Sequence, residues 1–346
     1  MLVLKMDEEP PASRRSRPGW GSWESLLALA RYSRRLRRTL QSVQPEVVIG
    51  RSLRAAIYGR LACVGLRVPF VWSVHDRLTR EYLGPSAPLF STLLPRLVDG
   101  IIANSVSTAT TLRSPRRPLL VLPPSARRSE VGRLHRPRDE QDSSPRIVVL
   151  GRLAEWKGQD LAVRAFEAVA EQFDAVLDIA GAALFDEGSF EERLRRQVAD
   201  STMPARIRLL GHVDDPMALL AEADVLLHCS RLPEPFGAVV LEGMRAEVVV
   251  VATEPGGPSE VIDHGVTGWL ATAGDVGALE DALRSALSMP RDDRAAMVAE
   301  AAALADRFDS SVLTPRLIDW LGLLVEGRAP RMTHAVAGMS GDGDGA

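Results

Sequence analysis

Two glutamates, Glu234 and Glu242, lie with seven residues between them in the segment Pro-Glu-Pro-Phe-Gly-Ala-Val-Val-Leu-Glu-Gly-Met, residues 233–244. Glu234 is flanked by prolines, which exclude a helix at that point, so we expect it in a loop. Glu242 lies one turn or more inside an apolar helix that begins near Ala238. At ~1.5 Å of rise per helical residue, the two carboxylates lie on the order of 10 Å apart.

The backbone between the two glutamates is a candidate phosphate seat. The first N–H groups of a helix have no partner within the helix, and here they belong to Gly237, Ala238 and Val239. Such N–H groups bind phosphate well. One carboxylate for a sugar, one for a ribose and a phosphate seat between them predict a nucleotide-sugar site.

A second segment, residues 147–158, reads as a buried strand followed by a loop with two cations, Arg152 and Lys157. Of the 42 basic residues in the chain only Lys5 and Lys157 are lysines, so position 157 favours a compact ammonium over a planar guanidinium. Two cations at the end of a parallel strand suit a diphosphate leaving group. Taken alone, the pair is more typical of two solvated surface cations.

A third segment, residues 254–270, is rich in glycine. Gly256 and Gly257 permit a tight turn and a close approach of the backbone to a ligand. Two later glycines, 265 and 268, are interpreted as turn residues only. Glu260 fits two roles, a partner for the first turn of a helix or a residue of the site.

These three segments, in this order and spacing, closely resemble the retaining GT-B glycosyltransferases called group 1 or family 4. The resemblance covers roughly residues 46–325 and is most specific in the C-terminal half. It implies an α/β fold of two Rossmann-like domains with parallel sheets that face a cleft. The alternation of short apolar segments and helical patterns along the chain agrees with that fold.

The resemblance also implies roles for individual residues. Arg152 and Lys157 would hold the donor diphosphate together with the backbone of Gly237, Ala238 and Val239. Glu234 would contact the transferred sugar with Phe236 and Gly237, and Glu242 would bind the ribose hydroxyls. Gly256, Gly257 and Glu260 are further candidates for the site.

His75 follows a predicted strand in the segment Val-Trp-Ser-Val-His-Asp, residues 71–76. Open α/β sheets build their sites at this end of their strands. Taken alone, such a histidine is typical of a capping or core position. The resemblance implies a catalytic position for His75, facing the donor sugar across the cleft.

The predicted organisation divides the chain into five parts. These are an N-terminal domain (1–124), a linker (125–145), a donor-binding domain (146–310), a C-terminal helix (311–325) and a disordered tail (326–346). The family usually begins with a strand, a Gly-Gly loop and a helix that this chain lacks in recognisable form. We therefore expect a short N-terminal domain, in which residues 1–4 are compatible with the remnant of a second strand.

The net charge of −3 hides an asymmetry between the two halves. Residues 1–146 carry 25 basic and 12 acidic side chains, whereas residues 147–346 carry 17 and 33. Within residues 14–38 there are eight arginines and one acid, on a helical pattern with a leucine stripe. A basic amphipathic helix is typical of contact with an anionic membrane surface, and equally of a helix that packs its leucines on its own domain.

Composition excludes several classes of protein. No apolar run is long enough to span a bilayer, the first residues do not form a signal peptide, and two cysteines, Cys63 and Cys229, give no disulfide or zinc pattern. A cytoplasmic location follows, peripheral to the membrane if the basic helix binds it. No Gly-x-Gly-x-x-Gly follows a strand, which excludes a nicotinamide dehydrogenase. There is no Asp-x-Asp metal motif in the core, so we expect neither metal nor cofactor.

The sequence thus predicts transfer of a sugar from a UDP- or GDP-linked donor to a hydroxyl acceptor, with retention, in polysaccharide, glycolipid or glycoconjugate biosynthesis. The basic N-terminal half favours an anionic or lipid-linked acceptor and not a nucleic acid. Two alternatives stay open. A degenerate partner protein would bind the nucleotide sugar without transferring it, and an epimerase would act on the donor without an acceptor.

Overall fold

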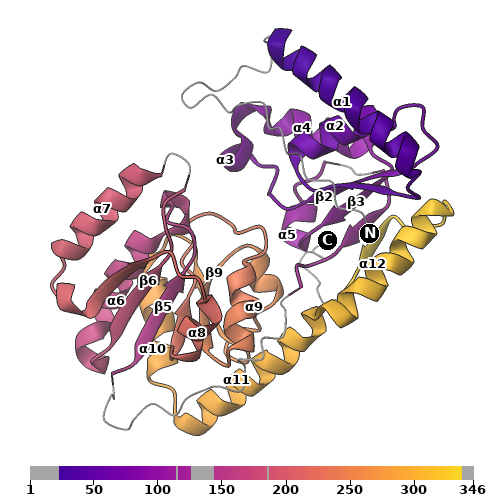
Figure 1. The fold of residues 1–346 in the computed structure, drawn as a ribbon. Coiled ribbons are helices and arrows are strands. Elements are labelled where there is room, and N and C mark those ends of the chain that lie inside the picture. The colour runs from indigo at the N-terminus through magenta and orange to yellow at the C-terminus, as the bar shows by residue number, and fades with distance from the viewer. Residues whose placement is uncertain (1–22, 114–115, 126–143, 185–186, 337–346) are drawn as a thin grey trace.

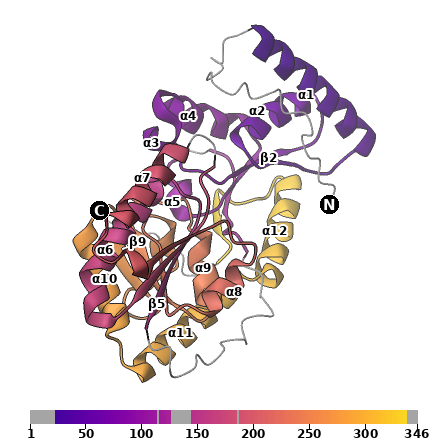
Figure 2. The same cartoon turned by 60° about the vertical axis from the view of Figure 1, so that its left-hand side comes forward.

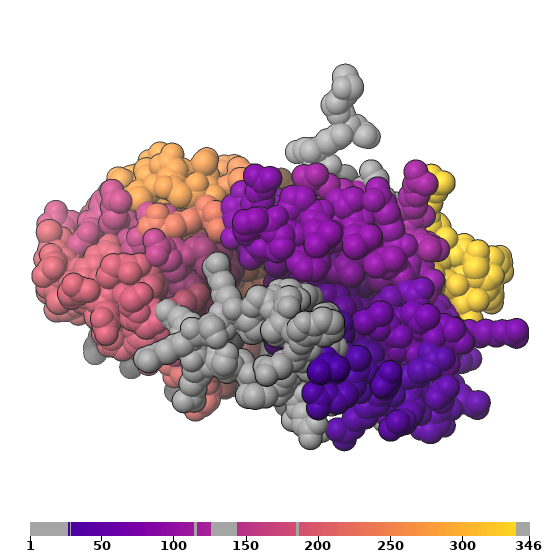
Figure 3. Space-filling model, turned by 90° about the horizontal axis from the view of Figure 1, so that it is seen from above, coloured from indigo at the N-terminus to yellow at the C-terminus, as the bar shows by residue number. Residues whose placement is uncertain are grey.

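The computed structural model describes residues 23–113, 116–125, 144–184 and 187–336, which form two α/β domains (Figure 1). Each domain is built on one sheet in which every strand pair is parallel. Seen from above, the two domains lie side by side, with the C-terminal helix at the side of the N-terminal domain (Figure 3). The predicted fold of two Rossmann-like domains is confirmed.

The N-terminal sheet has five strands in the order β1-β2-β3-β4-β11. Their bounds are β1 (Val48–Gly50), β2 (Phe70–Val74), β3 (Gly100–Ala103), β4 (Leu119–Val121) and β11 (Met332–His334). Three longer helices and two short ones belong to this domain, α1 (Trp23–Val43), α2 (Leu53–Cys63), α3 (Arg80–Leu83), α4 (Ala87–Leu97) and α5 (Val106–Ala109), with a 3-10 turn η1 (Gly84–Ser86).

Side chains alternate between the two faces of this sheet. Phe70, Trp72 and Ile101 share a buried cluster with residues of α1, α2 and α4, so these three helices cover one face. Val71 and Ile102, the intervening residues, point to the other face and pack in a different cluster. Two views 60° apart show α1, α2 and α4 together on the same outer side (Figures 1 and 2).

The second face of the N-terminal sheet is covered by α12 (Ser310–Val325), which crosses back from the C-terminal domain. Gly100 makes this packing possible, because a Cβ there would lie 2.9 Å from the Trp320 ring and 3.0 Å from the Leu324 side chain. The C-terminal helix is therefore part of the N-terminal domain's core.

The prediction that residues 326–346 form a disordered tail is wrong for the described part of that segment. Residues 332–334 form β11, which pairs with β4 in register Met332↔Leu119, and Ala335 and Val336 are buried. Pairing with the sheet supplies the hydrogen bonds that this short polar segment cannot make alone. Residues 337–346 lie outside the described residues.

The C-terminal sheet has six strands in the order β10-β9-β8-β5-β6-β7. They are β5 (Arg146–Leu150), β6 (Val176–Ala180), β7 (Ile207–Gly211), β8 (Val225–Leu227), β9 (Val249–Glu254) and β10 (Trp269–Thr272). The chain runs outward from β5 in one direction and, after β7, outward from β8 in the other. The order therefore reverses between β5 and β8, and open α/β sheets bind their ligands at such a reversal.

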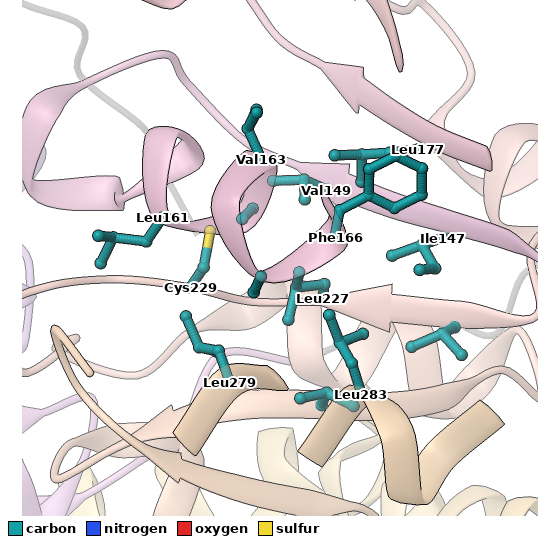
Figure 4. Close-up of a cluster of buried hydrophobic side chains, with 14 of the residues drawn as sticks. Ile147, Val149, Leu161, Val163, Phe166, Leu177, Leu227, Cys229, Leu279 and Leu283 are labelled. Carbon is teal, nitrogen blue, oxygen red and sulfur yellow. The ribbon is translucent and has the colours of Figure 1, made fainter. Parts of the chain in front are cut away.

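Helices cover both faces of this sheet. One face carries α6 (Gln159–Phe173), α7 (Gly188–Ala199) and α10 (Val276–Leu287); the other carries α8 (Pro216–Ala221), α9 (Ala238–Arg245) and α11 (Arg291–Ala305). Short 3-10 turns connect them, η3 (Glu155–Lys157), η4 (Pro204–Arg206), η5 (Gly257–Glu260) and η6 (Asp306–Phe308). Phe166 of α6 and Leu279 and Leu283 of α10 pack against the strand residues Ile147 and Leu227 in the core (Figure 4).

Part of the predicted basic helix is confirmed. Helix α1 packs on α2, with the Tyr32 and Tyr58 ring centroids 5.1 Å apart and Leu40 buried, while Arg34 and Arg38 are exposed. Residues 14–22, and most of the predicted linker, lie outside the described residues. Among the described helices, none has the length and apolar character needed to cross a membrane.

We predict that Trp320→Ala lowers the free energy of unfolding by about 3 kcal/mol, because a large buried ring leaves a cavity between α12 and the sheet. Ile318→Ala, on the same helix but 61% exposed, serves as the control and should change it by less than about 0.5 kcal/mol. Urea denaturation of both variants measures the difference. Equal effects would mean that α12 is not anchored through Trp320.

Candidate active site

The site lies where the strand order reverses, between the loops that follow β5 and β8. Gly158, at the end of the first loop, has φ +70°, and a Cβ there would lie 2.1 Å from the carbonyl oxygen of Cys229 in the second. Arg231 N–H donates to the carbonyl of Trp156 at 2.8 Å. Only glycine permits this approach, so Gly158 determines how closely the two loops lie together.

The approach brings Lys157 and Glu234 together across 77 residues of chain. The Lys157 ammonium donates to both carboxylate oxygens of Glu234, each at 2.8 Å, and lies 4.4 Å from the centroid of the Trp156 ring. The two side chains are 20% and 10% exposed, so the pair lies at the floor of the site and still reaches solvent. An ammonium held against a carboxylate and a ring face is preorganised to meet a second anion.

Three buried polar residues hold the Glu234 carboxylate in place. The Ser230 hydroxyl donates to Oε2 at 2.9 Å, and His228 Nε2 lies 3.4 Å from the same oxygen. His228 Nδ1 accepts the backbone N–H of Thr253 at 3.4 Å, which leaves the proton on Nε2, the nitrogen that faces Glu234. The carboxylate therefore has a single orientation, aimed at Lys157.

The residues that support Glu234 in this network were not predicted from the sequence. His228 was not among the predicted site residues, although it follows β8 directly and stands beside the reversal of strand order. A histidine at the end of the strand that precedes Glu234 was the available signal. Its use required knowledge that β8 and not another strand borders β5.

The network keeps Glu234 ionised. Burial alone raises the pKa of this carboxyl, but the hydrogen bond from His228 and the charge of Lys157 outweigh it and lower the pKa to about 2. Glu234 is thus a carboxylate at all physiological pH values. It can accept hydrogen bonds from sugar hydroxyls and stabilise positive charge, and it cannot act as a general acid.

Arg152, at the start of the same loop as Lys157, also lies near Trp156. Its guanidinium carbon is 6.0 Å from the Trp156 ring centroid, and Nε is 3.6 Å from a carboxylate oxygen of Glu187. Arg152 and Lys157 thus both lie within 6.0 Å of the centroid of one indole ring, and both are part of the same short loop. The two predicted cations therefore lie on the same loop, near the Trp156 ring, which was not among the predicted site residues.

Helix α9 begins where the sequence predicted it. Gly237 is the N-cap, with the left-handed values φ 78° and ψ 60°, and Ala238 behind it is exposed. The side chain of Phe236 is 3% exposed and packs with Phe308 in the core, so only its backbone can contribute to the site. The seat of N–H groups from Gly237 to Val239 is therefore open beside Glu234.

Glu242 lies one turn into α9 and is half-buried. Burial raises the pKa of its carboxyl. Within the described part of the chain, this carboxylate has neither an ion-pair partner nor a hydrogen-bond donor. A half-buried acceptor without a protein partner is suited to a ligand hydroxyl.

Gly256 and Gly257 act on the site through packing. A Cβ on Gly256 would lie 2.8 Å from the backbone nitrogen of Glu234, and one on Gly257 would lie 2.2 Å from the Cα of Phe236. The N–H of Gly257 donates to the carbonyl of Glu234 at 2.9 Å. These glycines let one loop support the backbone that carries Glu234.

The Glu234 loop also touches the N-terminal domain. The Tyr82 hydroxyl donates to the carbonyl of Pro233 at 2.9 Å, and the Ser105 hydroxyl donates to the carbonyl of Pro235. The Tyr82 and Trp156 ring centroids are 5.8 Å apart. The loop with the central carboxylate is therefore held from both domains.

Glu260 links the domains by capping a helix. Its carboxylate accepts the N–H groups of Val106 at 2.7 Å and Ser107 at 2.5 Å, at the start of α5. Burial raises the pKa of Glu260 to about 7, although these two hydrogen bonds and the charge of Arg77 oppose the rise. The helix that Glu260 contacts is thus α5 of the other domain and not the turn that Pro258 opens, and its role as a site residue stays a prediction.

His75 lies at the end of β2, in the N-terminal domain. Its Nε2 is 2.9 Å from the Ser73 hydroxyl, and the Asn104 amide donates to its carbonyl at 3.1 Å. Burial, followed by the charge of Arg51, lowers its pKa, so the ring is neutral near pH 7. The contacts described for His75 all lie within its own domain, and its catalytic role stays a prediction.

No group of three or more His, Cys, Asp or Glu side chains suited to a metal ion occurs among the described residues. The predicted independence of metal is a separate matter and requires a measurement.

Two α/β domains, each built on a sheet of parallel strands, form the architecture of the GT-B class of fold. A family model described as glycosyl transferases group 1 matches residues 132–304, and one described as glycosyltransferase family 4 matches residues 4–125. The chain belongs to the group 1 glycosyltransferases.

Individual relatives agree with this membership. A phosphatidyl-myo-inositol mannosyltransferase of Mycobacterium leprae is 36% identical over 178 residues, which cover 50% of this chain and 45% of that relative. The lipopolysaccharide core biosynthesis mannosyltransferase LpcC of Rhizobium leguminosarum bv. viciae is 26% identical over 278 residues, 78% of this chain and 73% of the relative. The match thus spans less than half of the first relative's length.

Among solved structures, Alr3699/HepE of Anabaena in complex with UDP and glucose superposes with a TM-score of 0.76 and 25% identity. The superposition covers 88% of this chain and 84% of that protein. The likeness includes both domains.

We predict that Lys157 and Glu234 are strongly coupled. Lys157→Met leaves the Glu234 carboxylate without its cation, and Glu234→Gln leaves the Lys157 ammonium without its anion. Each single variant should therefore lower the free energy of unfolding by about 3 kcal/mol. The double variant should cost less than the sum of the two. Urea denaturation of the four proteins measures the coupling.

The exposed pair Arg193 and Glu155 is the control, with an expected coupling of less than about 1 kcal/mol. Additive effects at Lys157 and Glu234 would contradict the pairing.

We also predict a pH effect of Glu260. Below about pH 4.5 its carboxyl is protonated in both the folded and the unfolded chain; between 4.5 and about 7 only the unfolded chain releases the proton. The free energy of unfolding should therefore fall as the pH rises through this range. Glu260→Gln should remove that fall and add a constant loss of roughly 1 kcal/mol for a weakened cap. Denaturation at several pH values tests it; an identical slope in the variant would refute the assignment.

Proposed function

We propose that this protein transfers a glycosyl group from a nucleoside-diphosphate sugar to a hydroxyl acceptor, with retention of the anomeric configuration. The observation that carries the proposal is the Lys157–Glu234 pair at the reversal of strand order, beside the open N-terminus of α9. The donor is UDP- or GDP-linked. The complex of the Anabaena relative with UDP and glucose favours UDP.

In the proposed complex, the donor diphosphate binds the Lys157 ammonium and replaces Glu234 as its ion-pair partner. Arg152 and the N–H groups of Gly237 to Val239 bind the remaining phosphate oxygens. Glu234, freed on one side and still held by His228 and Ser230, accepts hydroxyl groups of the sugar. Glu242 accepts the ribose hydroxyls. This exchange costs little reorganisation because Lys157 and Glu234 are already in position.

The chemical step breaks the bond between the anomeric carbon and the diphosphate oxygen. The acceptor oxygen forms its bond to that carbon on the same face, and its proton passes to the departing phosphate. Lys157, Arg152 and the α9 N-terminus stabilise the charge that develops on the diphosphate, and the Glu234 carboxylate stabilises positive charge on the sugar. These groups supply the stabilisation without a metal ion or other cofactor. His75 completes the sugar pocket from the N-terminal domain.

The acceptor is proposed to be anionic or lipid-linked, and the reaction to serve glycolipid or glycoconjugate biosynthesis. Two observations support this. Relatives are named for phosphatidyl-myo-inositol and for lipopolysaccharide core biosynthesis. Four of the five arginines of α1 are exposed on the N-terminal domain, which suits a peripheral position at an anionic membrane.

Calorimetric titration with UDP, GDP and ADP, in buffer with EDTA, tests the donor site. One nucleotide should bind, and Lys157→Ala should weaken that binding at least 10-fold through loss of a charge-assisted contact. Glu234→Gln should retain nucleotide binding within a few-fold but lose roughly 10²–10³-fold in transfer rate from the matching donor. Glu222→Gln, a 60% exposed carboxylate on the far side, is the control.

Other outcomes separate the alternatives. Nucleotide binding without transfer to any lipid or saccharide acceptor would identify a non-catalytic donor-binding protein. Conversion of the donor sugar without an acceptor would identify an epimerase. Loss of activity in EDTA, restored by a divalent cation, would overturn the proposed metal independence.

A further inference from the structure

We propose that the outer face of the N-terminal domain, formed by α1, α2 and α4, binds an anionic phospholipid bilayer, and that a leucine ridge on α4 inserts into it. The ridge consists of Leu89, Leu93 and Leu97. This inference deepens the proposed function, because it says how the enzyme would reach a lipid-linked acceptor. It concerns a surface whose binding can be measured without any sugar transfer.

The ridge is regular, and the residues that the structure describes leave it exposed. Its three leucines recur every four residues on α4 and are 57%, 45% and 44% exposed. The opposite face of α4, with Leu94, already packs in the core of the domain. A helix that is apolar on both faces normally has both faces covered. We therefore expect Leu89, Leu93 and Leu97 to contact an apolar environment other than the core of the domain.

The apolar surface continues onto the neighbouring helix. Leu61 near the end of α2 and Val64 directly after it are 46% and 52% exposed. The Arg60 guanidinium donates to the carbonyl of Leu97, which joins the end of α2 to the end of α4. Both helices cover the same face of the sheet, with α1 packed over α2 (Figures 1 and 2).

The charge of this face matches a bilayer of anionic lipids. The sequences of α1, α2 and α4 contain five, two and one arginine and a single acid, Glu24. On α1, Arg31, Arg34, Arg35 and Arg38 are exposed. Peripheral proteins bind membranes with such a surface: apolar side chains insert between the lipids, and neighbouring basic side chains contact the phosphate groups.

Other occupants fit this face less well. A second copy of the chain would place arginines against arginines, and like charges across an interface are unfavourable. Single-stranded nucleic acid binds through exposed aromatic rings among cations, whereas here Tyr32 and Tyr58 pack on each other. Double-stranded nucleic acid would use the arginines and leave the exposed leucines without an apolar environment. An anionic bilayer uses both the leucines and the arginines.

The surface lies close to the cleft. Tyr82, whose hydroxyl binds the Pro233 carbonyl beside Glu234, precedes Leu89 by seven residues. Even a fully extended chain of that length spans no more than about 25 Å. A bilayer at the ridge would thus present the headgroups of its lipids near the proposed acceptor side of the site.

The test compares binding of the full-length protein to vesicles of phosphatidylcholine alone and of phosphatidylcholine with phosphatidylglycerol, by flotation. The wild type should bind only the anionic vesicles, and less at high salt. The triple variant Leu89→Ser/Leu93→Ser/Leu97→Ser should lose binding at least 10-fold. Arg34→Glu/Arg35→Glu/Arg38→Glu should lose it as well.

A matched control replaces three apolar side chains of similar exposure elsewhere, Leu184→Ser/Val266→Ser/Ile318→Ser, which are 53%, 49% and 61% exposed. It should bind anionic vesicles as the wild type does. Titration of the same samples with UDP reports on folding and on the donor site. Failure of the proposed function would appear there, independently of vesicle binding.

Insertion itself can be read from one position. Leu93→Cys, labelled with an environment-sensitive dye, should show a blue shift with anionic vesicles, and selective labelling is feasible because Cys63 and Cys229 are buried. The proposal is overturned if the wild type does not bind anionic vesicles at low salt, or if the leucine variant binds them normally. It is equally overturned if the wild type forms a dimer that the leucine variant lacks while neither binds vesicles.

Discussion

The approach of the loops after β5 and β8 is the constraint on which the site depends. A parallel sheet that reverses its strand order leaves an opening at its carboxyl edge, and here that opening receives Lys157 from one side and Glu234 from the other. Gly158 lets the loops meet at a distance that any side chain would prevent. His228, Ser230 and Thr253 then fix the carboxylate from below. The result is an ammonium with a defined position and an anionic neighbour that a ligand can replace.

The two domains are not independent units. Helix α12 leaves the C-terminal domain to cover the second face of the N-terminal sheet, and β11 adds a strand to that sheet. In the opposite direction, Glu260 caps α5, and the Glu234 loop accepts hydrogen bonds from Tyr82 and Ser105. The apolar contacts between the domains thus involve α12, and these polar contacts lie beside the site.

The charge asymmetry of the chain acquires a spatial meaning in the fold. Eight arginines of the N-terminal half lie on α1, α2 and α4, which cover the outer face of the N-terminal sheet, whereas the Lys157–Glu234 pair belongs to loops of the C-terminal sheet. Tyr82, whose hydroxyl donates to the Pro233 carbonyl in the Glu234 loop, lies only a few residues before α4 in the chain.

The elements that depend on local patterns could be predicted from the sequence. Apolar runs between glycines and prolines located the strands of both sheets except β11, and the Pro-flanked Glu234 and the start of α9 near Ala238 follow from backbone restrictions of nearby residues. The types of residue at the site were equally visible, since Lys157 and the two glutamates carry their chemistry in their side chains.

The tertiary structure decided which of these groups meet. The Lys157–Glu234 pair, the His228 support and the Glu260 cap join residues far apart in the chain, and their distances depend on strand order and helix packing, which no local window contains. Residues 332–334 lack the apolar pattern of a strand and become one only beside β4, whose open edge supplies their hydrogen bonds. The sequence by itself determined the chemical groups and the elements that carry them. Only the packing of the two sheets decided their geometry, because contacts between distant residues form when the whole domain has closed around them.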